Sequence, residues 1–250
     1  MAGHSKWANI KHRKGAQDAK RGKLFTRLGK EITIAARGGG DPSSNSGLRT
    51  AIANARSKNM PNDRIDKAIK RGTGELGGAV LEEISYEGYG HGGVAILVQC
   101  VTDNINRTAA DVRHAFSKHG GKMGVAGSVG YLFDQKGLVC VDEEKADEDS
   151  VMEIVIDAGA EDVASSDGVV EVTTPMERLH AVAAALEEAD IIPESVELIQ
   201  VPSMTIAVSG KEALGVLKLI MILDDLDDTL KVSANFDIDD EEMAQIQDEL

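Results

Sequence analysis

The hydrophobic pattern of this chain changes its period near residue 80, and this change constrains the fold more than any other feature. Before it, apolar residues return every three to four positions, as in the series Phe25, Leu28 and Ile32. Such spacing places them on one face of a helix. After it, apolar runs typical of strands, such as residues 94–101, alternate with further helical stretches. A helical domain followed by α+β domains is the expected multidomain α+β fold.

Three helices are predicted before the change of period. The first begins at Lys23 and ends before the glycines at 38–40, because consecutive glycines strongly disfavour a helix. Pro61 separates the second helix from the third, where it suits the first turn. These helices predict a domain over residues 23–80. Residues 1–22 show almost no apolar periodicity, and they are predicted to form a basic arm that orders on a partner.

The strand-rich part divides into two ferredoxin-like domains, one inserted into the other. Residues 135–204 follow the order β-α-β-β-α-β, which is a complete ferredoxin-like unit. Residues 81–134 supply one βαβ unit, and a helix and a strand remain at residues 205–240. Since these two segments have no other partner, we expect them to form one discontinuous domain around the insertion. The chain is acidic from Asp237 onward and is predicted to fray there, and residues 241–250 are assigned as an acidic tail.

Charge is distributed very unevenly along the chain. Residues 1–74 contain 17 Lys and Arg against 5 Asp and Glu, whereas residues 134–250 contain 6 against 31, within a total net charge of −15. One end therefore attracts a polyanion and the other repels it. A solvated basic helix face is the simpler reading, but it accounts poorly for 17 cations spread over several elements. The pattern indicates nucleic-acid binding through the N-terminal part.

Aromatic residues are scarce, at 3% of the chain. Residues 128–133 are predicted to form a strand in which Tyr131 and Phe133 alternate onto a core face. Protein surfaces that bind single-stranded RNA stack bases on exposed aromatic side chains. Base stacking on the sheet is therefore disfavoured, and we expect recognition to rely on phosphates and shape.

The segment from residue 102 to residue 108 leaves a predicted buried strand and enters a predicted helix. Polar side chains and backbone amides at a helix start form a ready anion site. Two readings stay open. One is a capped β-to-α loop in which Asn106 or Thr108 caps the helix. The other is a phosphate or sugar contact made by Asn104 and Arg107.

Motifs for catalysis, cofactors and metals are absent from the sequence, so a non-enzyme without a cofactor is expected. Residues 88–93 have the spacing of a dinucleotide-binding loop, but they precede a strand instead of a helix and are better explained as a hinge. Cys100 and Cys140 lie in apolar runs and are predicted to be buried. No apolar run is long enough to cross a membrane, so a cytoplasmic protein is expected.

Several motifs resemble those of the YebC family, in the same order and over nearly the full length. They are Gly3–Trp7, Lys11–Lys14, Gln17–Lys23, Tyr86–Gly90, Asp103–Thr108 and Gly127–Phe133. The family also includes the mitochondrial translational activator of cytochrome oxidase, and the missing presequence makes this chain similar to a bacterial member. The resemblance implies a helical N-terminal domain and two α+β domains.

The resemblance also implies a regulator of gene expression. Family members are described as DNA-binding transcriptional regulators and as translation factors that act on the ribosome and relieve stalling at proline runs. The expected partner is thus rRNA or tRNA on the ribosome, or double-stranded DNA as the alternative. The oligomeric state stays open, a monomer included.

The candidate contacts with nucleic acid are mostly cations. Lys118 and Lys122, at the far end of the helix that follows residue 104, either extend a basic surface or offset the helix dipole. The full set is Lys6, Trp7, Lys11, His12, Arg13, Lys14, Lys20, Arg21, Lys23, Arg27, Asn104, Asn106, Arg107, Lys118 and Lys122.

Overall fold

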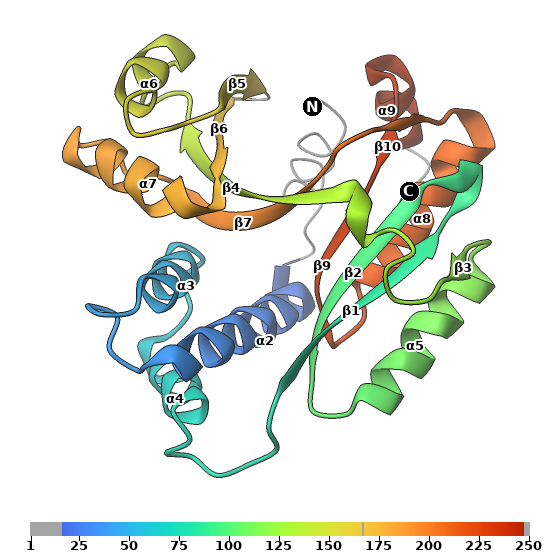
Figure 1. Ribbon diagram of the computed structural model, residues 1–250, viewed down its shortest axis with the longest axis horizontal. Helices are drawn as coiled ribbons and strands as arrows, with labels where there is room; N and C mark the ends of the chain where they lie inside the picture. The colour runs from blue at the N-terminus through green and yellow to red at the C-terminus, as the bar shows by residue number, and fades with distance from the viewer. Residues whose placement is uncertain (1–16, 167, 248–250) are drawn as a thin grey trace. The chain divides into compact units, whose positions relative to one another are not determined.

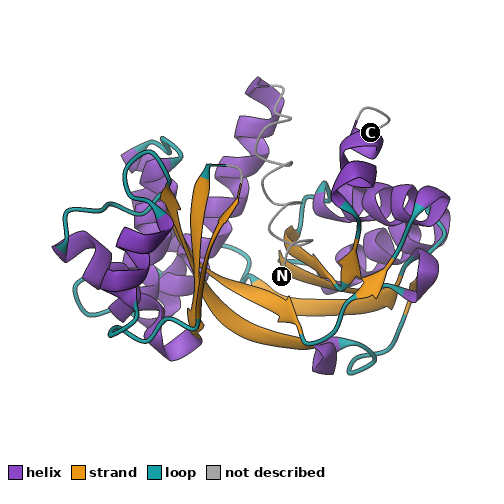
Figure 2. Ribbon diagram, turned by 90° about the horizontal axis from the view of Figure 1, so that it is seen from above, coloured by secondary structure: helices purple, strands orange, loops and turns teal. Residues whose placement is uncertain are grey.

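The computed structural model describes residues 17–166 and 168–247, which fold into two compact units (Figure 1). The described residues of Ala16–Gly78 and Gln135–Gln200 form one unit, and those of Ala79–Asp134 and Val201–Leu250 form the other. Both units combine helices with strands (Figure 2). The mixed α+β fold predicted from the sequence is confirmed. Residues 1–16 of the predicted arm lie outside the described residues.

The N-terminal part of the first unit is helical. Its elements are α2 (Gln17–Ala35), η1 (Ala36–Gly38), α3 (Ser46–Ser57) and α4 (Asn62–Gly72). The apolar faces expected from the periodicity meet in one core, which includes Ile32, Leu48 and Ile65. Helix α2 begins at Gln17 and not at Lys23, so residues 17–22 of the predicted arm are part of the first helix.

Asn45 joins the end of α2 to the start of α3. Its side-chain oxygen accepts the Leu48 amide at 3.0 Å and caps α3. Its side-chain nitrogen donates to the carbonyls of Ala35 at 2.8 Å and Gly39 at 2.9 Å. One side chain therefore satisfies backbone groups at two helix ends, which fixes the turn between the helices.

The same unit contains a complete ferredoxin-like domain. Its elements are β4 (Phe133–Asp142), α6 (Glu148–Val155), β5 (Asp162–Ser166), β6 (Val169–Pro175), η4 (Met176–Arg178), α7 (Leu179–Glu188) and β7 (Ser195–Pro202). The strand order is β5-β6-β4-β7. Strands β4 and β6 run antiparallel, as do β5 and β6. Valines from the strands and α6, such as Val139, Val155 and Val172, pack against Leu186 of α7 in the core.

Two side chains of α3 bond to the ferredoxin-like domain within this unit. The amide of Asn54 donates to the carbonyl of Val196 in β7 at 2.7 Å and accepts the amide of Val196 at 3.3 Å. The Thr50 hydroxyl lies 3.2 Å from Nδ1 of His180. Burial, and then the charge of Arg49, lower the pKa of His180. The neutral imidazole is therefore the form that suits this contact.

The second unit is discontinuous in sequence. Its elements are β1 (Glu82–Tyr89), η2 (His91–Gly93), β2 (Ala95–Thr102), α5 (Ile105–Lys118), β3 (Lys122–Met123), η3 (Gly130–Leu132), β8 (Ile206–Ala207), α8 (Gly210–Asp224), β9 (Thr229–Ala234), β10 (Phe236–Asp237) and α9 (Asp240–Gln247). The sheet order is β3-β1-β2-β9. Even-numbered residues of β2, such as Ile96, face a core built with α5 and α8.

This sheet has a ferredoxin-like strand order, but with a different chain path. Strand β1 pairs antiparallel with both β2 and β3, so α5 crosses over β1 between two parallel strands. Strand β9 adds to the far side of β2, also antiparallel. In a standard ferredoxin-like unit the strand that occupies the place of β1 follows the first helix, whereas here it comes first. The βαβ unit expected from the sequence was therefore missing this strand.

Strand β1 was not predicted, and its last two residues, Gly88 and Tyr89, were interpreted as part of a hinge. It contains few apolar residues, and its Gly88 is required by packing. A Cβ atom at Gly88 would lie 2.7 Å from the Phe116 ring and 2.8 Å from the Lys122 carbonyl. The glycine therefore lets a fully buried phenylalanine pack directly against the strand backbone.

Two further predictions were wrong. Residues 128–132 form a bend and the 3-10 helix η3 instead of a strand, and the strand begins only at Phe133; Tyr131 is exposed while Phe133 is buried. The C-terminal residues do not fray from Asp237, because α9 places Met243 and Ile246 in the core of the second unit. Both errors arise where tertiary contacts, not local pattern, decide the conformation.

Substitutions of two helical glycines by alanine should change stability in opposite directions. A Cβ at Gly72 would lie 2.3 Å from the Thr33 carbonyl oxygen and 2.6 Å from the Ala36 Cβ, so Gly72→Ala should cost about 1–3 kcal/mol through overpacking of α4 on α2. A Cβ at Gly22 in α2 would meet no atom of the described residues within 4 Å, so Gly22→Ala should stabilise the protein by about 0.5–1 kcal/mol. Denaturant unfolding of both variants measures these changes, and equal effects would contradict the packing of α2 on α4.

Candidate nucleic-acid interface

The described helical residues carry a large excess of positive charge. Residues 21–74 contain 12 Lys and Arg against 4 Asp and Glu. Arg21, Arg49, Arg64 and Lys70 are exposed, whereas the apolar residues of the same helices face the core. The folded domain is therefore a small apolar core covered by cations, as expected for a surface that binds a polyanion.

Two arginines of this surface are held on one aromatic ring. The guanidinium of Arg21 lies 5.4 Å from the ring centroid of Phe25, and that of Arg64 lies 5.5 Å from the same centroid. Phe25 itself is 8% exposed and belongs to the core. Within the part of the chain that the structure describes, neither guanidinium forms an ion pair. The ring therefore orients two cations that are paired with no carboxylate of residues 17–166 or 168–247.

The partners of nearby charges differ along α4. Lys67 pairs with Asp63 one turn earlier, at 3.9 Å, and both side chains are largely exposed. Lys70 and Arg71 occupy the last turn, where cations interact favourably with the helix dipole. Arg64 has neither of these structural roles. This difference makes Arg64 the most informative cation of the helix for a binding experiment.

The structure distributes the predicted contact residues over both units. Lys6, Trp7, Lys11, His12, Arg13 and Lys14 lie outside the described residues. Lys20, Arg21, Lys23 and Arg27 belong to α2, and Asn104, Asn106, Arg107, Lys118 and Lys122 belong to the second unit. Arg64 was missed. No local motif marks it, because its place beside Arg21 depends on the packing of α4 against α2.

Asn104 and Arg107 make structural contacts at the start of α5. The Asn104 side chain accepts the backbone amide of Arg107 at 3.1 Å and caps α5. The prediction that Asn106 or Thr108 is the cap was therefore wrong. The Arg107 guanidinium donates to Asp228 at 2.8 Å and to Asp103 at 3.0 Å. The capped loop accounts for these bonds, and a phosphate contact stays a prediction.

Asp228 is the centre of this network. Its carboxylate also accepts the hydroxyl of Thr102 at 3.1 Å and that of Thr108 at 2.8 Å, and its side chain is only 10% exposed. The three donors come from β2 and α5, whereas Asp228 immediately precedes β9. The network therefore bonds the two sequence segments of the second unit to each other.

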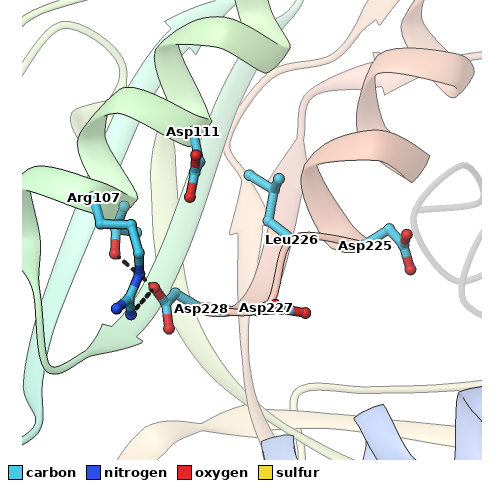
Figure 3. A pocket seen from close by; sticks show the side chains of 7 residues that line it. Arg107, Asp111, Asp225, Leu226, Asp227 and Asp228 are labelled. Atoms are coloured by element: carbon cyan, nitrogen blue, oxygen red, sulfur yellow. Dashed lines mark hydrogen bonds and ion pairs between the residues drawn. The ribbon is translucent and has the colours of Figure 1, made fainter.

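A cavity of about 230 Å³ adjoins this network (Figure 3). Figure 3 shows the Arg107 side chain directed to Asp228, with Asp111 and Asp225 on other parts of the wall. Four carboxylates and one guanidinium line the cavity, so a phosphate would be repelled there. Among the described residues, no group of three or more potential ligands is arranged to hold a metal ion.

The remaining predicted residues of the second unit are exposed. Asn106 lies in the first turn of α5, Lys118 in its last turn and Lys122 in β3. Lys118 is placed where it offsets the helix dipole, whereas Lys122 lies beyond the helix. No helix of the described residues is long and apolar enough to cross a membrane.

Family models match both parts of the chain. The model of the TACO1/YebC protein N-terminal domain matches residues 5–75, and that of the TACO1/YebC second and third domain matches residues 81–236. The chain belongs to the TACO1/YebC family. The resemblance identified from the sequence motifs is therefore confirmed, and the basic helices correspond to the N-terminal domain of the family.

Individual relatives cover nearly the whole chain of this TACO1/YebC protein. Proteins named "Probable transcriptional regulatory protein" from Syntrophotalea carbinolica and Acidithiobacillus ferrooxidans are each 54% identical, over 98% and 99% of this chain and 99% of each relative. The crystal structure of a conserved hypothetical protein, Aq1575 from Aquifex aeolicus, is 44% identical with a TM-score of 0.85. That match covers 91% of this chain and 95% of the Aquifex chain.

Removing the carboxylate of Asp228 should destabilise the second unit. Asp228→Ala leaves the hydroxyls of Thr102 and Thr108 without their acceptor, and loss of such charge-assisted bonds costs about 1.5–3 kcal/mol. The neighbouring Asp227 is exposed, so Asp227→Ala should change the free energy of unfolding by at most about 0.5 kcal/mol. Urea unfolding of the two variants compares them, and equal losses would show that the network does not stabilise the unit.

Arg107→Ala separates the two readings of the loop before α5. If Arg107 is structural, the variant should melt at a lower temperature, and the folded variant should bind an RNA probe as the wild type does. Arg113, exposed on the same helix, provides the matched control, and Arg113→Ala should leave the melting temperature unchanged. A loss of RNA affinity in Arg107→Ala without a change in melting temperature would instead support the phosphate contact.

Proposed function

We propose that this protein is a non-catalytic regulator of gene expression that binds RNA on the ribosome and relieves stalled translation. The observation that carries the proposal is the pair of arginines stacked on Phe25 in a helical domain with 12 cations and 4 acids. The names of the relatives support the regulation of gene expression. The role on the ribosome rests on the family resemblance.

Charge supports an oriented encounter with a polyanion. The cations are concentrated in the helical domain, whereas residues 134–250 contain 31 Asp and Glu against 6 Lys and Arg. Long-range attraction and repulsion of this kind direct one part of a protein to phosphates and raise the association rate. Because the guanidiniums of Arg21 and Arg64 are already oriented by Phe25, less side-chain entropy is lost when they bind phosphate.

The second candidate is a regulator that binds double-stranded DNA, which the names of the relatives favour. A recognition helix contacts base edges through its N-terminal residues. The corresponding turn of α4 begins after Pro61 and contains Asp63, which is repelled by the phosphates that flank a groove. This arrangement supports RNA over a helix-turn-helix contact with DNA.

Sedimentation of the full chain with ribosomes in a sucrose gradient tests the proposal. The protein should enter ribosomal fractions at low salt and leave them as salt is raised, because phosphate contacts release counterions. Absence from ribosomal fractions at low salt would overturn the ribosomal role. A sequence-selective footprint on a duplex, in its place, would establish the second candidate.

Arg64→Ala should reduce the salt dependence of RNA binding. For a single strand, each lost phosphate contact reduces the log–log slope by roughly 0.7. Lys145→Ala is the control, since it removes the same charge from an exposed position in the acidic ferredoxin-like domain. The slopes are measured by fluorescence anisotropy over a salt series. Equal log–log slopes for Arg64→Ala and the wild type would show that Arg64 does not contact the RNA.

A further inference from the structure

Tyr131 is the most exposed aromatic side chain among the described residues. Its exposed fraction is 73%, whereas Tyr89 is 37% exposed and each of the others is at most 8% exposed. Within the described part of the chain, its hydroxyl has no hydrogen-bond partner. The core therefore does not use this ring.

The loop that carries Tyr131 is bound to Glu87 of β1. One carboxylate oxygen accepts the amide of Gly127 at 2.7 Å, and the other accepts those of Val129 at 2.6 Å and Gly130 at 2.8 Å. Burial raises the pKa of Glu87, but the backbone N–H groups of this loop outweigh it and hold the pKa below its usual range. The ionised carboxylate therefore forms strong, charge-assisted bonds to the loop at neutral pH.

Residues on both sides of Tyr131 are also fixed. Val129 is fully buried and Phe133 is 8% exposed, in a cluster on the face of β2 opposite α5. The carbonyl of Leu132 accepts the amide of Ser203 at 2.8 Å and its hydroxyl at 3.1 Å. The backbone beneath the exposed ring is thus held at Gly130 and Leu132, so the position of the ring is largely determined before any ligand binds.

The chain segments on either side of Tyr131 and Ser203 carry no charged side chain of their own. Residues 123–133 and 202–209 contain no charged side chain, in a protein in which 28% of residues are charged. Lys122 in β3 is exposed, and its backbone lies opposite Tyr89 of β1 in the sheet. The Tyr89 hydroxyl donates to the Ser128 carbonyl of the loop at 2.9 Å. Tyr89 therefore connects the strand position of Lys122 to the loop that carries Tyr131, and an exposed aromatic face with a lysine on an adjoining element suits an aromatic base and its phosphate.

We infer that Tyr131 is a stacking platform for an unpaired RNA base, with Lys122 beside it as the phosphate contact. This inference rests on the proposed RNA-binding function, and it adds a second contact in a different unit from the stacked arginines. The two contacts differ in kind. The arginines respond to phosphate charge in any RNA, whereas a stacking platform requires a base that is not already stacked in a duplex. Glu87 is a positioning residue, because it acts on the base only through the loop.

The test measures binding of the full chain to two probes. One is a single-stranded oligoadenylate with one 2-aminopurine, whose fluorescence is quenched by stacking, and the other is a perfect RNA duplex. Tyr131→Ala should weaken binding to the single strand about 5- to 150-fold, the range for loss of one stacked base. Tyr131→Phe should retain affinity and quenching, and neither variant should change binding to the duplex.

A second control tests whether the loss of any exposed apolar side chain weakens binding. Ile192 is 71% exposed in the other unit, and Ile192→Ala should leave binding to both probes unchanged. Wild-type affinity of Tyr131→Ala for the single strand would overturn the platform, and so would an equal loss for the duplex. If the variant kept its RNA affinity but no longer sedimented with ribosomes, the loop would be a protein contact instead.

Glu87→Gln tests the positioning role. The glutamine amide nitrogen would face a backbone N–H, so the amides of Gly127, Val129 and Gly130 should exchange faster with solvent. Binding to the single strand should weaken toward the level of Tyr131→Ala, while binding to the duplex stays unchanged. Glu83→Gln, at an exposed position of the same strand, should behave as the wild type. Unchanged single-strand affinity despite faster exchange would refute the positioning role.

The outcomes separate this inference from the proposed function. If the wild-type protein binds both probes and Arg64→Ala weakens both, but Tyr131→Ala weakens neither, the platform fails and RNA binding stands. If the wild-type protein binds neither probe at low salt, the proposed function itself fails.

Discussion

The pairing of β2 with β9 is the constraint on which the second unit depends. Strand β2 is an inner strand of the sheet, and its neighbour β9 follows the inserted domain in the sequence. The ladder runs from Ile96 opposite Ala234 to Cys100 opposite Thr229. Asn235 extends this ladder. Its side-chain oxygen accepts the backbone amide of Ala95 at 2.7 Å, and its backbone amide donates to the Ala95 carbonyl at 3.1 Å. Contacts so distant in sequence form slowly and must be strong enough to offset the entropy of loop closure.

The helical domain has the opposite organisation, since its core forms from neighbouring helices and the proposed contact residues lie on its surface. Phe25 connects this core with the surface, because its side chain packs in the core and its ring also contacts the guanidiniums of Arg21 and Arg64. The loop at Tyr131 also combines buried and exposed groups, but in a different way. There a carboxylate inside the unit holds the backbone, so that an aromatic side chain can stay exposed in a fixed position. The proposed phosphate and base contacts thus depend on separate physical devices.

Periodicity and composition predicted most helices, the complete ferredoxin-like domain and the discontinuous arrangement of the other. They failed at β1, where Gly88 and several glutamates conceal a strand that is needed for packing against Phe116. They failed again at α9, because two buried apolar residues are too few to mark a helix in an acidic segment. At Tyr131, alternation predicted a buried ring, whereas bonds from Glu87 to the loop backbone replace the strand with a turn.

The sequence by itself determined the change from helices to α+β domains, the gradient of charge and the family of the protein. These properties are local or additive, so they can be read from spacing, counts and motifs. The tertiary structure alone decided that Arg64 joins Arg21 on one ring, that Arg107 bonds to Asp228 and that Tyr131 is presented to solvent. Each of these depends on a partner from another element, and no local pattern specifies which distant residue will arrive there.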